Sequence, residues 1–299
     1  MRDIAIIGSG PAGLSASLYA KRAGLSTYVY KGETAGGLLT TTEQIDNYLG
    51  LPEYSGNSMA ESFISHAEKL GVDILSSSVV RIDQNTDESF SVTSVSNADK
   101  KETTEQYRAV IFAAGSKPRK LEIPGEDLEG VSWCAVCDGT FAEDEEVIVV
   151  GGGESAVEEA IYMSNIASKV TVLLRGPDFK ATKPAVENLL SRPNVDVIYN
   201  NSIQSMHGDE DGNLAFVKLA DNTEIQVYSV FEAIGQIPQS TLAGKHAEVY
   251  ADGFISHSKT DGFFIAGDVA DPEYRQVAIA VGDGAKAAID AIRWLQKAK

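Results

Sequence analysis

Two cysteines, the only ones in the 299-residue chain, stand close together in the stretch WCAVCDG, residues 133–139. Cys134 and Cys137 are separated by two residues, and Asp138 directly follows the second cysteine. In a C-x-x-C pair the sulfur atoms can form and break a bond without a large backbone movement. A neighbouring carboxyl group is suited to proton transfer to a leaving thiolate. The spacing therefore predicts redox chemistry, with Cys134, Cys137 and Asp138 as catalytic residues.

Two other interpretations of the cysteine pair are less well supported. A zinc site needs two more soft ligands, but no H-x₃₋₅-H pair occurs among the four scattered histidines, which we expect on the surface: His66, His207, His246 and His257. We therefore expect no bound metal. A structural disulfide across so short a loop would add little stability. Asp138 is also a candidate helix N-cap in CDGTF, a role that is compatible with proton transfer.

The chain contains an internal repeat, with one copy before the cysteine pair and the other after it. DIAIIGSGPAGLSASLYAKRAGLSTYVYKG and EVIVVGGGESAVEEAIYMSNIASKVTVLLRG each contain an apolar run, a glycine turn, a helix-length segment and another apolar run. The first motif glycines, Gly8 and Gly151, differ by 143 positions, as do Gly13 and Ala156. Two copies in register predict two βαβ units, each opening a parallel sheet.

The repeated motif is typical of a dinucleotide site. The first glycine allows a tight turn, the second lets a pyrophosphate approach the backbone, and the third position permits close helix–strand packing. In the two copies these positions are Gly8, Gly10 and Gly13, and Gly151, Gly153 and Ala156. Glu33 follows Gly13 by 20 residues and is suited to a ribose hydroxyl, whereas Arg175 follows Ala156 by 19 and is suited to a 2′-phosphate. The first site thus favours FAD or NAD, and the second favours NADP.

The order of these segments predicts an α/β fold of two Rossmann-like (βαβ) nucleotide-binding domains, the second inserted in the first. Two apolar strands that end in small residues and proline, in YRAVIFAAGSKPR and YSVFEAIGQIPQ, are the expected crossings. We predict an FAD-binding domain over 1–114 and 242–299, and an NAD(P)H-binding domain with the C-x-x-C over 115–241. Residues 67–109 and 195–229 alternate in polarity and predict meanders or hairpins.

The composition narrows the possible partners. The formal net charge is −18, with 43 acidic and 25 basic residues, which disfavours nucleic acid and anionic membranes. Solubility, including in a salty cytoplasm, is the simplest reading of this acidity. No apolar stretch reaches the length of a bilayer span, and MRDIAIIGSG does not resemble a secretion signal. We expect a cytoplasmic protein.

Over nearly its full length the chain resembles the low-molecular-weight bacterial thioredoxin reductases. The matching landmarks are IIGSGPAGLSA, GGLLTTTEQIDNYLG, FAAGSKPRKLEIPGE, CAVCDG, GGGESAVEEAIYMSNIASKVTVLLR and GFFIAGDV…YRQ. The resemblance implies an FAD domain, an inserted NADPH domain, a homodimer, and a rotation of one domain against the other. It further implies that Cys137 meets the flavin and that Cys134 attacks the disulfide of thioredoxin or a similar small protein.

The resemblance also assigns residues to the cofactors. For FAD these are Gly8, Ser9, Gly10, Pro11, Ala12, Gly13, Tyr30, Lys31, Gly32, Glu33, Gly36, Gly37, Leu38, Asn47, Val80, Ala113, Ala114, Gly115, Gly267, Asp268, Arg275, Gln276 and Val277. For NADPH they are Gly151, Gly153, Glu154, Ser155, Ala156, Arg175 and Lys180.

One motif departs from the family pattern. Where the family has His-Arg-Arg-x-x-x-Arg, residues 174–180 read LRGPDFK, so only Arg175 matches and Lys180 conserves a charge. Each lost phosphate contact costs roughly 1.5–3 kcal/mol. Glu154, at the start of the phosphate-facing helix, also disfavours an anion.

This departure leaves the electron donor open between NADPH, NADH, and reduced ferredoxin or another flavin donor. A dithiol oxidase and a flavin-bound sensor are further alternatives.

Overall fold

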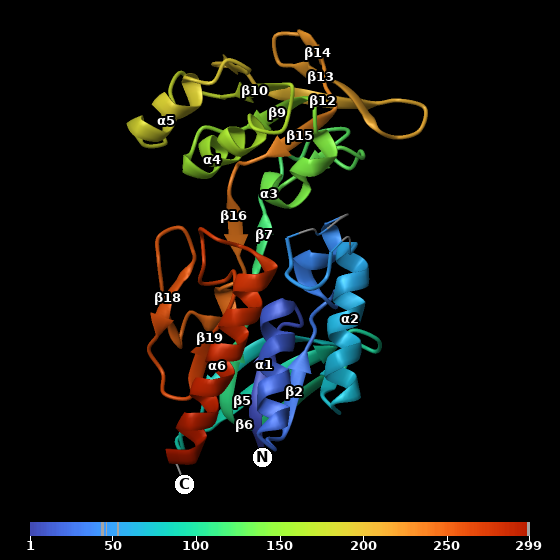
Figure 1. The fold of residues 1–299 in the computed structure, drawn as a ribbon. Helices are drawn as coiled ribbons and strands as arrows, with labels where there is room; N and C mark the ends of the chain where they lie inside the picture. The colour runs from blue at the N-terminus through green and yellow to red at the C-terminus, as the bar shows by residue number, and fades with distance from the viewer. Residues whose placement is uncertain (43–44, 46, 53, 298–299) are drawn as a thin grey trace. The chain divides into compact units, whose positions relative to one another are not determined.

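The computed structural model describes residues 1–42, 45, 47–52 and 54–297, and the chain divides into two compact units. Unit 1 comprises Met1–Lys117 and Ile237–Lys299, and unit 2 comprises Pro118–Gln236 (Figure 1). Residues 43–44 and 46, within the GGLLTTTEQIDNYLG landmark, lie outside the described residues. The chain leaves unit 1 once and returns to it, so the mixed α/β fold with an insertion is confirmed.

Unit 1 is built on a sheet of seven described strands in the order β3-β2-β1-β6-β5-β4, with β19 also paired to β6. Strands β1, β2, β3, β6 and β19 run parallel, whereas β4, β5 and β6 form the predicted meander. The bounds are β1 (Arg2–Ile7), β2 (Thr27–Tyr30), β3 (Asp73–Leu75), β4 (Ser77–Gln84), β5 (Phe90–Ser96), β6 (Glu102–Phe112) and β19 (Phe263–Ile265).

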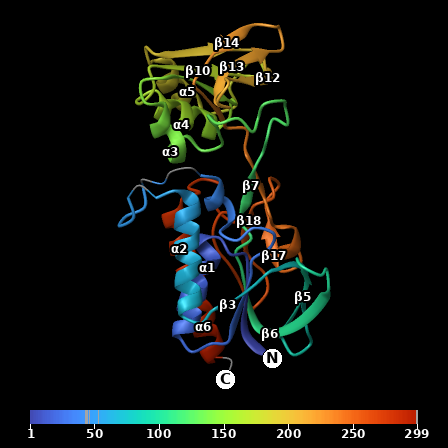
Figure 2. The same ribbon diagram turned by 90° about the vertical axis from the view of Figure 1, so that its right-hand side faces the viewer.

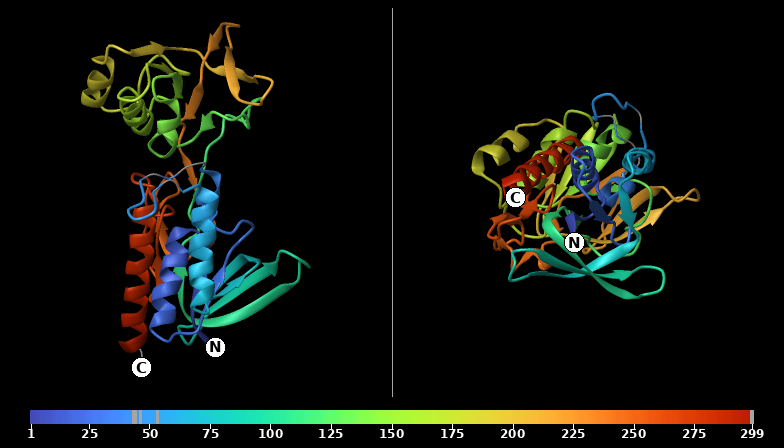
Figure 3. Two further views of the ribbon diagram at one scale, coloured as in Figure 1. Left: turned by 45° about the vertical axis from the view of Figure 1, so that its right-hand side comes forward. Right: turned by 90° about the horizontal axis from the view of Figure 1, so that it is seen from below.

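Three helices cover one face of this sheet: α1 (Pro11–Arg22), α2 (Gly56–Lys69) and α6 (Val277–Lys297). Figures 2 and 3 show them side by side, in blue, light blue and red. Alternate residues of β1 explain the layering: Ile4 and Ile6 are buried against the helices, and Ala5 and Ile7 against the opposite layer. That layer contains the small sheet β17 (Ala247–Val249) and β18 (Ile255–Ser258).

Unit 2 repeats this plan on a smaller scale. Its parallel sheet has the order β11-β10-β9-β15-β8, with bounds β8 (Val131–Ser132), β9 (Glu146–Val150), β10 (Lys169–Leu173), β11 (Val195–Ile198) and β15 (Ser229–Glu232). One face packs on α3 (Ala135–Asp138), α4 (Glu154–Met163) and α5 (Lys183–Leu190) (Figure 2). The other face packs on an antiparallel sheet, β12 (Ile203–Gly208), β13 (Leu214–Leu219) and β14 (Glu224–Gln226).

Two short strands at the crossings pair with each other. They are β7 (Ser116–Pro118) and β16 (Gln236–Pro238). The Gln239 amide donates to the Gly115 carbonyl at 2.9 Å, and the Arg119 amide donates to that of Gly235 at 2.9 Å. The outgoing and returning segments therefore form one ladder, close to the crossings expected from sequence.

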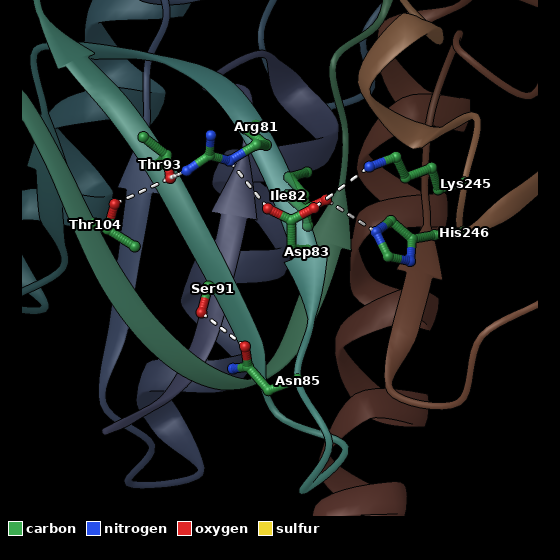
Figure 4. A network of polar contacts seen from close by, with 9 residues as sticks. All are labelled: Arg81, Ile82, Asp83, Asn85, Ser91, Thr93, Thr104, Lys245 and His246. Atoms are coloured by element: carbon green, nitrogen blue, oxygen red, sulfur yellow. Dashed lines mark hydrogen bonds and ion pairs between the residues drawn. The ribbon is translucent and has the colours of Figure 1, made fainter.

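One histidine contradicts the expected surface location. His66 and His257 are exposed, but His246 is only 4% exposed and its ring stacks on Phe263. Its Nε2 lies 3.1 Å from the Ile82 carbonyl on β4 (Figure 4). The surface prediction for His246 was wrong because its imidazole contacts the sheet through Ile82. The two residues are 164 positions apart, so the contact forms only when the chain returns to unit 1. Beside it, Asp83 bridges Arg81 and Lys245.

No helix of the described part is long and apolar enough to cross a bilayer.

Candidate active site

Cys134 and Cys137 form a disulfide in unit 2, with their Cα atoms 5.3 Å apart. Cys134 is the N-cap of α3, and its carbonyl accepts hydrogen bonds from the amides of Cys137 at 3.1 Å and Asp138 at 3.0 Å. One helical turn thus closes the loop and brings the two sulfurs together. Both cysteines are half-buried, and Val136 between them is 41% exposed.

Asp138 lies at the N-cap position of the 3₁₀ helix that follows it, but its side chain hydrogen-bonds to Ser132. The Ser132 hydroxyl donates to Asp138 Oδ2 at 2.5 Å and accepts from the Cys134 amide at 3.1 Å. No side-chain cap bond is formed by Asp138 at the short 3₁₀ helix Gly139–Ala142. A single hydroxyl therefore connects the carboxyl group to the backbone of the redox turn.

Two residues of this turn's surroundings were not predicted from the sequence. One is Ser132, and the other is Glu159, a 7% exposed side chain of α4 whose Oε2 accepts from the Ala135 amide at 3.3 Å. The burial of Glu159 could have been predicted from its spacing. Ala156 lies three residues before it and Met163 four residues after it, so all three share the buried face of α4.

Along the described chain, no three or more His, Cys, Asp or Glu side chains come together as a possible metal site.

The first glycine turn has the geometry that the motif predicts. Gly8 has φ +110°, and a Cβ there would lie 2.2 Å from the Ala113 carbonyl oxygen; one on Gly13 would lie 2.0 Å from that of Gly8. Around Gly10, by contrast, only the Gly36 oxygen lies as near as 3.9 Å. Gly10 is the N-cap of α1 without a side-chain cap bond. The first turn of α1 therefore presents amides to an uncrowded position, which suits a pyrophosphate.

Most of the other residues predicted for FAD lie near this turn. The Gly8 amide donates to the Tyr30 carbonyl, the Gly36 amide to that of Ser9, and the Ala113 amide to that of Ile7. Lys31 and Gly32 follow β2, whereas Ala114 and Gly115 follow β6. Parallel strands place these segments at one edge of the sheet. The 3₁₀ helix Gly37–Thr41, which contains Leu38, begins beside Gly10, since a Cβ on Gly37 would lie 3.3 Å from the Gly10 Cα.

The segment after β19 completes this edge. A Cβ on Gly267 would meet the Ala12 Cβ at 2.9 Å. Burial raises the pKa of the neighbouring Asp268 to about 6, and the nearby Arg275 opposes the shift. Arg275 has φ +33°, a left-handed backbone typical of constrained functional segments. The side-chain amide of Asn47 donates to Gln276 Oε1 at 3.1 Å, so two residues 229 positions apart in the chain are in contact.

Two residues assigned to FAD lie further from the turn. Glu33 is exposed and lines a cavity of about 280 Å³ with Ser78 and Asn97. Val80 is 46% exposed on β4, where the pairing with β5 shifts register between Val79 and Arg81.

The second glycine turn, in unit 2, follows the same pattern. Gly151 has φ +139°, and a Cβ there would lie 2.4 Å from the Ala233 carbonyl oxygen. A Cβ on Gly153 would meet nothing within 4 Å, and Gly153 is the N-cap of α4 without a side-chain cap bond. Ser155 and Ala156 lie in the first turn of this helix. The turn is open where a pyrophosphate would lie.

The segment LRGPDFK beside this turn offers few phosphate donors. Leu174 is 2% exposed, because its side chain packs on Gly152. Arg175 and Lys180 are exposed and remain available, and the Lys180 amide donates to the Gly152 carbonyl at 2.7 Å. Glu154 accepts from the Thr182 amide at 2.8 Å and from its hydroxyl at 3.0 Å. Its negative charge therefore orders the loop before α5 at the same helix terminus.

Two nucleotide-type turns at the ends of parallel strands, combined with a C-x-x-C disulfide and an adjacent acid, define a nucleotide-dependent disulfide oxidoreductase. The sequence profile of the pyridine nucleotide-disulphide oxidoreductases matches residues 2–284. The chain belongs to this family, and it is a disulfide oxidoreductase of the thioredoxin reductase type.

Similar proteins support this assignment over the whole chain. A thioredoxin reductase of Spironucleus barkhanus is 38% identical over 98% of this chain and 98% of its own. A bifunctional thioredoxin reductase/thioredoxin of Mycobacterium leprae is 35% identical over 99% of this chain and 66% of its own. The crystal structure of thioredoxin reductase from Streptococcus pyogenes matches with a TM-score of 0.90 and 34% identity over 99% of both chains.

Proposed function

We propose that this chain transfers electrons from NADPH through FAD and the Cys134–Cys137 disulfide to thioredoxin or a similar small protein. The observation that carries the proposal is the disulfide itself, closed over one helical turn with Asp138 held against that turn by Ser132. Relatives named thioredoxin reductase along the full chain support the choice of partner.

The two glycine turns fit the two cofactors. For FAD, the open position at Gly10 and the α1 amides would hold the pyrophosphate, and Asp268, Arg275 and Gln276 would hold the ribityl chain and ring. For NADPH, Gly153 and the α4 amides would hold the pyrophosphate, with Arg175 and Lys180 near the 2′-phosphate. When bound, the pair of cofactors supplies an electron pair that originates as hydride on the nicotinamide.

The residues of unit 2 carry out the thiol chemistry. Reduction of the Cys134–Cys137 bond takes two electrons and two protons, and Asp138 holds a proton for the leaving sulfur. The Cys134 thiolate then attacks the partner's disulfide, which forms a mixed disulfide and releases one partner thiol. Attack of Cys137 on Cys134 restores the original disulfide and releases the second thiol.

Single cysteine variants test this sequence of steps. Cys137→Ser should retain a flavin but lose NADPH-dependent reduction of thioredoxin. Cys134→Ser should do the same and should form no mixed disulfide with thioredoxin. Ser191→Ala, at the exposed end of α5, is the matched control. A Cys137→Ser protein that reduces thioredoxin as fast as the unmodified chain would refute the proposal.

Electron donors other than NADPH are also candidates, because the segment LRGPDFK has fewer side chains that could contact a 2′-phosphate than the family pattern has. Leu174 is turned into the core, and the adjacent cavity of about 370 Å³ is lined by Asp178 and Glu187 as well as Lys183. NADH, or ferredoxin acting on the flavin, would need no phosphate contact at this position. Bleaching of the flavin in stopped flow by NADPH, NADH and reduced ferredoxin distinguishes them. No bleaching at about millimolar NADPH would exclude NADPH as donor.

A homodimer in the cytoplasm completes the proposal. The exposed Leu49, Tyr250 and Tyr274 of unit 1 are candidates for contact with a second copy. Sedimentation of the flavin-loaded chain tests the assembly, and fractionation of cells tests the compartment.

A further inference from the structure

A buried carboxyl group of α4 lies directly behind the redox turn of unit 2. Glu159 is 7% exposed, and its Oε2 accepts a hydrogen bond from the Ala135 amide at 3.3 Å. Ala135 is the residue after Cys134 and is fully buried, whereas the next residue, Val136, is exposed. The carboxyl group therefore contacts the backbone of the turn on its buried side.

The turn packs closely against α4 at more than this one point. Figure 2 shows α3 beside α4, which agrees with the contacts between the two helices. A Cβ on Gly139, directly after α3, would lie 2.7 Å from Met163 Sδ and 3.1 Å from Tyr162 Cε1. Ala135 shares one hydrophobic cluster with Ala160 and Met163. This packing fixes the turn against α4, so the place of Glu159 behind it does not depend on a single hydrogen bond.

The contact with Glu159 works against a negative charge on the Cys134 sulfur. A thiolate is stabilised by cations and by backbone amides that point at it. The Ala135 amide, which belongs to the residue after Cys134, already has the Glu159 carboxyl group as its acceptor. A carboxylate near a thiolate also repels it, and the repulsion is strong where water is excluded. The arrangement therefore favours the thiol form of Cys134 once the disulfide is reduced.

The sequence around the turn supplies no positive charge to offset Glu159. Residues 121–168 contain 12 Asp and Glu residues and no Lys, Arg or His. Asp138 of α3 adds a second carboxyl group beside the turn, held by the Ser132 hydroxyl at 2.5 Å. Among the acidic residues of α4, Glu158 is exposed. The charged groups of α3 and α4 that face the reduced pair are thus acidic.

On the side of β8, the charged groups contact Trp133 instead of the sulfurs. Among the described residues, Lys120 lies near the turn, with its Nζ 4.4 Å from the centre of a Trp133 ring, and pairs with Asp127 at 3.7 Å. The Trp133 indole donates to Glu232 Oε2 at 3.0 Å. Burial raises the pKa of Glu232 to about 7. Any comparison of variants must therefore be made at the same pH, with Glu232 present in each.

We propose that Glu159 is a positioning residue that keeps Cys134 a protonated thiol in the reduced chain and so limits its reaction with small electrophiles. The inference rests on the proposed redox role of the Cys134–Cys137 pair. Loss of the Cys134 proton places a second negative charge beside the Glu159 carboxylate. Since the thiolate is the form that attacks, the exposed pair then reacts slowly with molecules that do not dock on the turn.

Alkylation of the flavin-loaded chain by iodoacetamide measures the proton on Cys134. Cys137→Ser leaves Cys134 as the single thiol of the chain, so the total mass follows its reaction. The thiolate displaces iodide and forms a carbon–sulfur bond, after its proton has passed to water. The rate at each pH is therefore proportional to the fraction of Cys134 that is ionised.

Glu159→Gln, made in the Cys137→Ser chain, keeps an oxygen acceptor for the Ala135 amide and removes the charge. Near neutral pH its Cys134 should react about tenfold faster than with Glu159 in place. The ratio of the two rates should fall toward one as the pH approaches about 10, where the thiol loses its proton in both proteins. A turn that is merely loosened would change the rate by the same factor at every pH. Glu232 is present in both proteins, so its titration cancels in the ratio.

Glu143→Gln, which removes an exposed carboxylate six residues after position 137, is the matched control. Its rate should change by less than about twofold, because water screens an exposed charge. Equal rates with Glu159 and with Gln at that position, a ratio that is constant with pH, or the same increase in Glu143→Gln would overturn the proposal.

A synthetic peptide of residues 131–140, with Ser at position 137, keeps the proposal testable if Glu159→Gln fails to fold. Cys134 in the folded Cys137→Ser chain should reach half of its maximal alkylation rate at a higher pH than in the peptide. A lower pH in the folded chain would overturn the proposal. No step of these measurements uses a nucleotide or thioredoxin. A chain that reduces no thioredoxin can still give the expected profile, and the reverse also holds, so the two proposals fail separately.

Discussion

Ser132 is the residue on which the acid and the redox turn both depend. Its hydroxyl donates to Asp138 and accepts from the Cys134 amide, so Ser132→Ala removes both bonds at once. We expect turnover with thioredoxin to fall about tenfold, since a buried hydrogen bond contributes about 1–1.5 kcal/mol. Steady-state assays measure this fall, with Ser191→Ala as the control. Full activity in Ser132→Ala would show that Asp138 does not depend on its hydrogen bond to Ser132.

Asp268 provides a prediction about stability and pH. Its pKa is raised by burial from an ordinary value near 3.8 to about 6. The folded state therefore binds a proton more tightly than the unfolded state, and the stability that results is lost as the pH rises through 6. Between pH 5 and 7.5 the flavin-free chain should lose about 1.4 kcal/mol relative to Asp268→Asn.

Urea unfolding of both proteins at several pH values measures this difference. Asp261→Asn, at an exposed site two residues before β19 begins, is the control and should follow the unmodified chain. Parallel pH profiles for Asp268→Asn and the unmodified chain would contradict the assignment of this proton.

At the scale of elements, substitutions in the two glycine turns distinguish a glycine needed for packing from a glycine needed for nucleotide binding. Gly13→Ala drives a methyl group into the Gly8 carbonyl, at 2.0 Å, and should cost about 3 kcal/mol or more. Gly153→Ala meets nothing within 4 Å and has an ordinary backbone, φ −85°, so its melting temperature should hold. Its methyl group would instead face the nucleotide and weaken NADPH binding.

Thermal melts and NADPH titrations measure the two effects of these substitutions. Gly282→Ala, an open position within α6, is the matched control for both. Normal NADPH affinity in Gly153→Ala would place the pyrophosphate elsewhere.

The same elements show what the sequence can and cannot predict. The glycine turns, the insertion and the Cys134–Cys137 pair follow local rules of turn geometry and spacing, so they could be predicted. Contacts such as Trp133–Glu232 could not, because they join residues 99 positions apart through the pairing of β8 with β15. The surface prediction for His246 failed for the same reason, because its ring becomes buried only when the returning chain packs against Ile82 on β4.

At the scale of the whole molecule, each unit has its own hydrophobic core. The described clusters of unit 1 draw on β1, β6, α1 and α6, and those of unit 2 draw on β9, β10, β15 and α4; no cluster of described residues includes members of both units. Charge is also unequally divided, because unit 2 carries 21 acidic and 8 basic residues, a net −13 of the total −18. The insertion therefore behaves as a domain in both packing and charge.

Removal of unit 2 should consequently leave a folded flavoprotein. Lys117 and Ile237 lie on paired strands, between the bonds Gly115–Gln239 and Arg119–Gly235, so a turn of about two residues can join them. All residues predicted for FAD belong to unit 1. The joined protein should unfold cooperatively and bind FAD, but it should not be reduced by NADPH and should reduce no disulfide. Absorbance near the flavin band and calorimetry, with the full chain prepared in parallel, measure this. A soluble, cooperatively folded product without flavin would mean that unit 2 contributes to the FAD site, against the division of labour that the two separate cores imply.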